Sequence, residues 1–291
     1  MIKTLDNGLK LEPSIDGTYS FLFDSDRIEL SLNYVTSNNI KRVTLNPFNG
    51  FTANNLKSIM PLSNVVEELI IGSETINYDG LGEFRKLTVL GALDNKKDII
   101  DLNNFPNLVT LNCNVTDRLK GLENSVKLES LTISDYKSKT KDLYALPSLN
   151  NLQYLSLIKT DITTMQGIER FSNLKNLEIF SASKLETIAP LEALSNSLEE
   201  VQIEKCKKVK DYETLRRVKS LKKIILCESG EIKSLAFVND LPLLEFISFW
   251  GTNVLDGNIK YCEGLNYVGF DNKKHYTHKS EQFKNNSEKT N

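Results

Sequence analysis

The feature that most constrains the fold is a short apolar motif that recurs along most of the chain. The motif is L-x-x-L-x-L, with L an apolar residue, and successive copies from Val66 onward are 20 to 24 residues apart. The first position falls at Val66, Leu87, Leu108, Leu128, Leu152, Leu174, Leu198, Leu221, Leu244 and Leu265, and a further copy precedes them at Ile40, Val43 and Leu45. A fixed period of this length predicts a solenoid in which each repeat contacts only its neighbours.

Each copy of the motif predicts one short parallel strand, followed by a return segment on the convex side. Because side chains alternate along a strand, the fourth and sixth residues of a repeat should face the core. The third, fifth and seventh residues should then face solvent on the concave side. We therefore expect an α/β solenoid with a concave parallel β-sheet, about 11 repeats over residues 40–272 and strands about 4.8 Å apart.

The clearest copies begin at Leu152, Leu174 and Leu221. They resemble the leucine-rich repeat family, and the resemblance extends over about residues 40–270. The sixth repeat, residues 160–174, is similar to the short units of bacterial internalins and phosphatase-regulator solenoids. The resemblance implies a leucine-rich repeat horseshoe. The chain departs from the family at the ninth position of the repeat, where Asn or Cys is usual, with Glu74, Asn95, Thr116, Tyr136, Thr160, Ala182, Cys206, Ser229, Thr252 and Lys273.

Both ends of a solenoid need a cover, because an open stack exposes apolar surface and unpaired strand edges. Residues 1–39 are predicted to be the N-terminal cap. Within them, apolar residues 21–23, a polar turn at residues 24–26 and the alternating Ile28, Leu30 and Leu32 favour a β-hairpin. Residues 273–291 are almost wholly polar, which predicts a flexible C-terminal tail.

The whole-chain properties favour a cytoplasmic protein. A net charge of -2 gives no overall attraction to nucleic acid. No stretch approaches the roughly 18 apolar residues of a membrane span, and the N-terminus lacks the apolar segment of a signal peptide. The four cysteines form no CxxC pair, which favours free thiols in a reducing compartment. A surface adhesin similar to internalins would need a secretion signal and a wall anchor, so we do not expect one.

The residues that usually carry catalysis or metal binding are sparse. The two histidines, His275 and His278, are too few for a metal site and favour a role in capping or at the surface. No histidine lies in the repeats to act as a base beside Cys206 or Cys227. The lysines at residues 205–210 are typical of a solvated turn, although a phosphate patch is the alternative. We expect no enzyme, no metal and no cofactor.

The concave positions of repeats 6 to 11 stand out. Five of these 18 positions are aromatic, whereas the chain average of 8% predicts one or two, and the first five repeats have none there. The same positions carry four acidic residues and a single basic residue, Lys223. The predicted partner-binding residues are Tyr154, Ile158, Glu178, Phe180, Glu200, Gln202, Glu204, Phe246, Trp250, Tyr267 and Asp271.

Two interpretations of this strip stay open. Exposed aromatic residues and an acidic surround are typical of a site for a protein partner of basic or mixed charge, rather than for nucleic acid or a membrane. Alternatively, aromatic residues pack on each other across strands, or Phe246, Trp250 and Tyr267 lie under the C-terminal tail. We favour binding. The protein would then be an inhibitor, such as a bacterial immunity protein that neutralises a toxin, or a regulatory scaffold that holds two partners.

Overall fold

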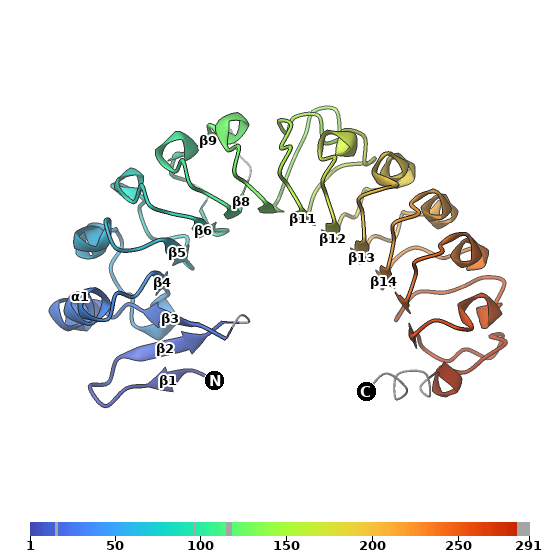
Figure 1. Ribbon diagram of the computed structural model, residues 1–291, viewed down its shortest axis with the longest axis horizontal. Helices are drawn as coiled ribbons and strands as arrows, with labels where there is room; N and C mark the ends of the chain where they lie inside the picture. Colours follow the sequence, from blue (N-terminus) through green and yellow to red (C-terminus); the bar gives the residue numbers. More distant parts are fainter. Residues whose placement is uncertain (15–16, 96, 115–117, 284–291) are drawn as a thin grey trace. The chain divides into compact units, whose positions relative to one another are not determined.

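The computed structural model describes residues 1–14, 17–95, 97–114 and 118–283. The chain divides into two compact units, residues 1–133 and residues 134–291, with the boundary at the end of one repeat strand. In each unit the strands line the inner, concave side, and short 3-10 helices lie on the outer side (Figure 1).

Unit 1 begins with three antiparallel strands, and the third of them pairs in parallel with the first repeat strand. The elements before the repeats are β1 (Lys3–Thr4), β2 (Lys10–Pro13), β3 (Tyr19–Leu22), η1 (Ser25–Arg27) and α1 (Ile28–Ser37). The repeat strands are β4 (Arg42–Leu45), β5 (Glu68–Ile71), β6 (Val89–Ala92), β8 (Thr110–Asn114) and β10 (Ser130–Ser134). The return segments contain η2 (Pro47–Asn49), η3 (Lys57–Leu62), η4 (Leu81–Glu83), β7 (Ile100–Asp101), η5 (Leu102–Asn104), β9 (Leu119–Lys120) and η6 (Leu122–Asn124).

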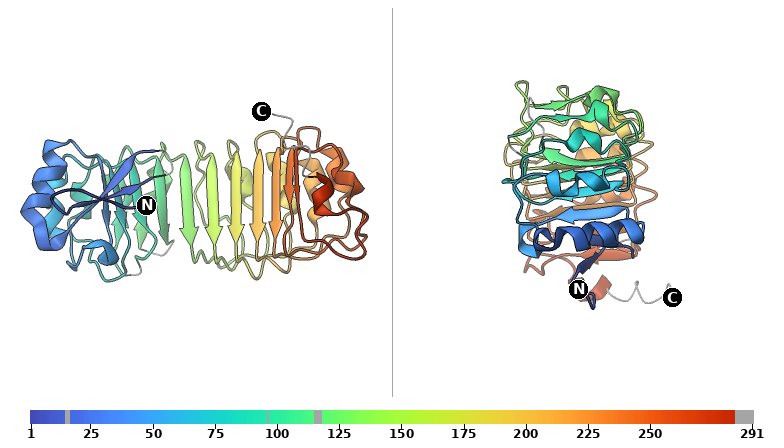
Figure 2. Two further views of the ribbon diagram at one scale, coloured as in Figure 1. Left: turned by 90° about the horizontal axis from the view of Figure 1, so that it is seen from below. Right: turned by 90° about the vertical axis from the view of Figure 1, so that its left-hand side faces the viewer.

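Unit 2 continues the same construction with six parallel strands side by side (Figure 2). They are β11 (Tyr154–Ile158), β12 (Asn176–Phe180), β13 (Glu200–Glu204), β14 (Lys223–Cys227), β15 (Phe246–Ser248) and β16 (Tyr267–Gly269). The return segments contain η7 (Ile168–Arg170), η8 (Ala189–Leu194), η9 (Tyr212–Arg217), η10 (Ala236–Asp240) and η11 (Ile259–Cys262). Every repeat strand in both units begins at the third position of its motif, which confirms the predicted strands.

The core of unit 2 consists of the fourth and sixth residues of each repeat together with apolar residues of the return segments. Leu155, Leu157, Leu177 and Ile179 are at most 1% exposed. A side chain of this size contributes about 1.5 to 3 kcal/mol when it is fully buried. Because each repeat supplies the same set, the stack is held together by apolar contacts between successive repeats.

A sharp turn follows each repeat strand from β10 to β15 and was not predicted. The eighth residue of the repeat has a positive φ, between 47° and 68°, in a left-handed conformation that glycine adopts most easily. These residues are Asp135, Lys159, Ser181, Lys205, Glu228 and Gly251. The turn directs the chain from the strand into the return segment and places the ninth residue under the end of the strand.

Hydroxyl groups at the ninth position replace the amide groups that are usual in the family. The Oγ1 of Thr160 donates to the carbonyl oxygen of Tyr136 at 3.0 Å. The Oγ of Ser229 donates to the carbonyl oxygen of Ile203 at 3.1 Å, and the Oγ1 of Thr252 accepts from the amide of Ser229 at 2.9 Å. Ninth-position hydroxyl groups therefore bond to neighbouring repeats at Thr160 and at Ser229 with Thr252, although the ninth residue varies and Ala182 has no hydroxyl. Thr116 lies outside the described residues.

The N-terminal hairpin differs from the predicted one. The hairpin is formed by β2 and β3, while the residues expected to be its second strand form the helix α1. Ser31 and Val35, one helical turn apart, are the buried residues of α1, whereas Leu30 is exposed. The alternation of Ile28, Leu30 and Leu32 was therefore misleading, and the prediction of a strand there was wrong.

The first part of the C-terminal tail is packed, which corrects the expectation of a flexible segment for residues 273–283. The hydroxyl of Tyr276 accepts from the amide of Val254 at 2.9 Å. The ring of Phe283 is 5.9 Å from that of Phe270, and Phe283 is buried. Two aromatic residues in an otherwise polar segment are enough to dock it on the last repeat. Residues 284–291 lie outside the described part of the chain.

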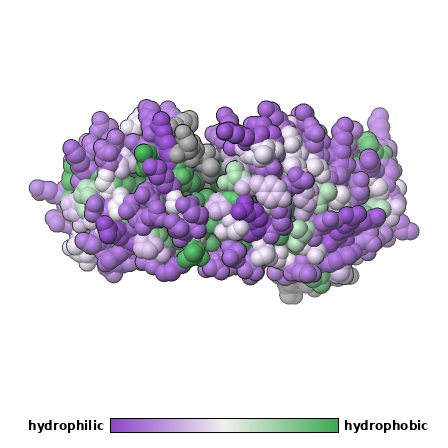
Figure 3. Space-filling model, turned by 90° about the horizontal axis from the view of Figure 1, so that it is seen from above, coloured by the Kyte–Doolittle hydropathy of each residue, from purple (hydrophilic) through white to green (hydrophobic). Residues whose placement is uncertain are grey.

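The outer surface is mainly hydrophilic, with small scattered apolar areas (Figure 3). Among the described residues, none of the helices has both the length and the apolar character required to cross a membrane.

Candidate functional site

The predicted binding residues lie on the concave side of unit 2, where the strand register arranges them in three rows. The first row consists of Tyr154, Asn176, Glu200, Lys223, Phe246 and Tyr267. The middle row consists of Ser156, Glu178, Gln202, Ile225, Ser248 and Gly269. Ile158, Phe180, Glu204 and Cys227 form the last row, which Trp250 and Asp271 continue at the seventh position of the next two repeats.

Side chains of the first row contact one another from strand to strand. The Nζ of Lys223 is 3.2 Å from a carboxylate oxygen of Glu200 and 5.6 Å from the ring centroid of Phe246. The rings of Phe246 and Tyr267 are stacked, with centroids 4.2 Å apart and planes 8° apart. From Glu200 to Tyr267, the first row is therefore a continuous series of a carboxylate, an ammonium group and two aromatic rings.

Tyr154 and Glu178 form a hydrogen bond between the first and middle rows. The hydroxyl of Tyr154 donates to the Oε2 of Glu178 at 2.6 Å. Burial, followed by the hydrogen bond and the negative charge of Glu178, raises the pKa of Tyr154 to about 12. The hydroxyl therefore remains a proton donor at neutral pH, and it holds the Glu178 carboxylate against the sheet.

Tyr267 and Trp250 meet over Gly269. A Cβ atom built on Gly269 would lie 2.8 Å from the hydroxyl oxygen of Tyr267 and 2.9 Å from the indole Nε1 of Trp250. A residue without a side chain is thus needed for the two rings to approach each other here. Trp250 is 44% exposed and Tyr267 is 39% exposed, so the aromatic end of the face is open to solvent.

These contacts decide between the two interpretations only in part. Phe246 and Tyr267 do pack on each other across adjacent strands, as the packing interpretation expected. The described tail does not cover the aromatic residues, because residues 275–277 instead bond to the backbone of Val254 and Gly257 on the return side. Trp250 and Tyr267 consequently stay exposed within residues 118–283.

The acidic side chains of the face differ in their partners, which the sequence did not predict. Glu200 is paired with Lys223, and Glu204 is 3.5 Å from the Nζ of Lys205. The carboxylate of Asp271, by contrast, accepts from the amide of Gly251 at 2.7 Å. Glu228, which the sequence prediction omitted, is exposed at the left-handed turn beside Gly251. Its place on the eighth position, outside the alternating strand pattern, explains the omission.

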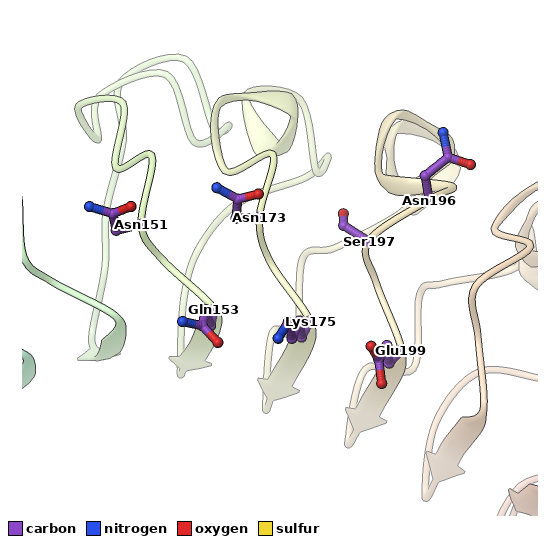
Figure 4. Close-up of a pocket in the computed structure, with 7 residues that line it drawn as sticks. All are labelled: Asn151, Gln153, Asn173, Lys175, Asn196, Ser197 and Glu199. Carbon is purple, nitrogen blue, oxygen red and sulfur yellow. The ribbon is translucent and has the colours of Figure 1, made fainter.

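A polar hollow on the flank of unit 2 was also missed from the sequence. Its volume is about 350 Å³, and its side chains precede or open three successive strands (Figure 4). It is lined by Asn151, Gln153, Asn173, Lys175, Asn196, Ser197 and Glu199. Glu199 is paired with Lys222 at 2.7 Å, and the amide of Asn173 donates to a backbone carbonyl. Such satisfied polar groups are typical of a solvated flank.

Two further hollows lie on other surfaces. On the concave side of unit 1, a hollow of about 770 Å³ includes Pro13, Thr44, Ile70 and Val89 in its lining. In unit 2, the lysines of the turn after β13 surround a hollow of about 450 Å³, where Lys208 is 3.9 Å from Glu186. Exposed lysines with a carboxylate among them fit the predicted solvated turn better than a phosphate site.

The cysteines and histidines take structural positions. Cys206 is buried, its Sγ is 3.3 Å from the carbonyl oxygen of Glu204, and burial raises its pKa to about 11. A thiol with a raised pKa is a poor nucleophile at neutral pH. His278 is 3.1 Å from Glu263, and His275 bonds to the carbonyl oxygen of Val254, so both hold the packed tail. In the described residues, no group of three His, Cys, Asp or Glu side chains could hold a metal ion.

Comparison with known proteins identifies the fold. No family model and no curated protein matches the sequence. Among solved structures, internalin C2 of Listeria monocytogenes has a TM-score of 0.52 and 22% sequence identity, over 65% of this chain and 83% of the internalin. The chain folds as a leucine-rich repeat solenoid. The predicted repeat architecture is confirmed.

Two other similar structures have lower scores. Internalin F of Listeria monocytogenes has a TM-score of 0.48 and 18% identity, over 76% of this chain and 72% of the internalin. A leucine-rich repeat protein of Leptospira interrogans has a TM-score of 0.39 and 16% identity, over 86% of this chain and 88% of the other. At 22% identity, the likeness to internalin C2 concerns the fold alone.

Proposed function

We propose that this leucine-rich repeat protein is a non-enzymatic binding module that recognises one protein partner through the concave face of unit 2. The supporting observation is the aromatic end formed by the half-buried Phe246 and the exposed Trp250 and Tyr267. A large, rigid aromatic side chain loses little entropy when a partner buries it, so such residues supply much of the affinity of protein interfaces. The rest of the face adds polar groups that are already held in place, among them Glu178 and Glu200.

The proposal is tested by affinity purification from the native host with the wild-type protein and the double variant Trp250→Ala and Phe180→Ala. Each truncated anchor should cost about 2 kcal/mol or more of binding free energy, so the partner should be lost from the double variant. Leu243→Ala with Leu255→Ala is the matched control, because these exposed apolar side chains lie outside the concave positions. Equal recovery of the same proteins by all three would contradict the proposal.

Within this proposal, we favour an inhibitor, such as an immunity protein of a bacterium that neutralises a toxin. A binding module can act on a toxin simply by covering the surface that the toxin needs. The four free cysteines, three of them buried, fit a reducing compartment such as the cytoplasm. An inhibitor requires one tight surface, so variants of the aromatic end should abolish protection of cells that express the toxin.

A regulatory scaffold that holds two partners is the second candidate, and the hollow on the concave side of unit 1 favours it. A scaffold needs two surfaces that can be lost separately. Ile70→Ala, in the hollow of unit 1, should then remove one partner, and Trp250→Ala should remove the other. Loss of a single partner through Trp250→Ala alone, with no effect of Ile70→Ala, would instead support the inhibitor.

A further inference from the structure

Trp250 is 44% exposed and lies in the repeat between those that carry Glu228 and Asp271. Glu228 follows β14, Trp250 follows β15 and Asp271 follows β16. The amide of Glu228 donates to the carbonyl oxygen of Trp250 at 2.8 Å, which fixes the backbone of Glu228 beside it. On the other side, the hydrogen bond from Gly251 fixes the carboxylate of Asp271.

We propose that Trp250, Glu228 and Asp271 form a socket for an arginine side chain of the protein partner. The inference rests on the proposed function and names the chemistry of the group that the partner inserts. The guanidinium group would stack on the indole ring, and its N–H groups would donate to the carboxylates of Glu228 and Asp271.

A cation already occupies the neighbouring aromatic ring. The ammonium group of Lys223 lies over Phe246, where it also pairs with Glu200. Among the described residues, the cation–π contacts are those of Lys223 with Phe246 and of Lys273 with Tyr276, so Trp250 has no such partner there. Tryptophan is the ring that attracts cations most strongly, and the repeats on both sides of this one each carry an acidic residue near it in the fold.

The arrangement suits arginine better than lysine. A guanidinium group is planar and carries five N–H donors in its plane, so it can stack on a ring and still donate to carboxylates on two sides. A lysine ammonium group is a compact, strongly hydrated charge without a flat face. Lys205, which occupies the same turn position as Glu228 in the preceding repeat, is paired with Glu204 and so does not fill the socket.

Because Trp250 is the single tryptophan of the chain, its fluorescence reports on this socket directly. The probes are three blocked tripeptides, acetyl-Gly-X-Gly-amide, in which X is arginine, lysine or citrulline. Citrulline has the shape of arginine without its charge. We expect a saturable change in Trp250 emission with the arginine peptide, binding roughly fivefold weaker with the lysine peptide, and no saturable change with the citrulline peptide.

Glu228→Gln and Asp271→Asn remove the charges and keep the shape and the hydrogen-bond acceptors. Each should weaken binding of the arginine peptide by roughly fivefold, while Glu231→Gln, an exposed carboxylate on the return segment, should leave it unchanged. The socket is overturned if the arginine peptide gives no saturable change, if lysine or citrulline binds equally well, or if Glu231→Gln has the same effect as the other two. Partner loss in the Trp250→Ala and Phe180→Ala variant, together with a failed peptide titration, would leave the proposed function standing without the socket.

Discussion

At the scale of single residues, a glycine determines where the aromatic anchors lie. Gly269 occupies a middle-row position, and the rings of Tyr267 and Trp250 fill the space that a side chain would take. The sequence predicted Tyr267 and Trp250 as outward residues from their place in the motif. It did not predict that they meet, because the two residues are 17 positions apart and their contact depends on the missing side chain between them.

Gly269→Ala should therefore displace the rings without unfolding the protein. The added methyl group would clash with the ends of flexible side chains and not with the backbone, so the free energy of unfolding should change by less than about 1 kcal/mol. The emission of Trp250 should shift, and recovery of the partner should fall. Gly72→Ala is the control, since a Cβ atom there would meet its nearest neighbour at an ordinary 3.7 Å. Identical emission and partner recovery for both variants would contradict this role of Gly269.

At the scale of the elements, the strands were predictable and the turns and the cap were not. The strand of each repeat follows from apolar residues at fixed spacing, because only one alternation buries both the fourth and the sixth residue. The left-handed turn contains residues as different as Lys159, Ser181 and Glu228. Its conformation therefore cannot be predicted from the residue type. The helix α1 was missed because its buried side is short and two of its apolar residues face solvent.

The ninth-position hydroxyl groups offer a test at this scale. Thr160 is buried, and its Oγ1 donates to Tyr136 and accepts from the amide of Ile162 at 3.3 Å. Thr160→Val keeps the shape but leaves the amide of Ile162 without the hydroxyl and removes one of the two hydrogen bonds to the Tyr136 carbonyl, which should cost about 1 to 3 kcal/mol in the free energy of unfolding. Thr160→Ser keeps the hydroxyl and should cost less. Urea unfolding followed by far-UV circular dichroism measures both, and equal losses would mean that these hydrogen bonds do not stabilise this turn.

At the scale of the whole molecule, stability in a solenoid is a sum over neighbouring repeats, so damage at one end should stay local. Phe270 forms the core of the last repeat. It is buried, stacks on Phe249 at 5.1 Å and contacts the rings of Tyr276 and Phe283. The packed tail is thus attached to the repeats through this ring as well as through its hydrogen bonds to Val254 and Gly257.

Phe270→Ala should cost about 3 to 5 kcal/mol locally. Because Trp250 lies in the adjacent repeat, its fluorescence transition in urea should occur at a lower concentration than the transition seen by far-UV circular dichroism. Phe23→Ala is the control at the other end of the chain, where Phe23 packs against Phe21 and Phe51. That variant should not move the Trp250 transition ahead of the circular dichroism transition. Coincident transitions in Phe270→Ala would show that the loss spreads through the chain.

The residue-to-residue register of β11 to β14 also bears on how such a face can evolve. Gain or loss of one complete repeat between Phe180 and Trp250 would preserve the chemistry of both anchors and change their separation by one strand spacing, about 4.8 Å. Duplication of a repeat would thus change, in discrete steps, the length of the partner segment that spans the two anchors. Point substitutions would instead change what each anchor recognises. Partner length and partner chemistry can accordingly diverge through separate kinds of mutation.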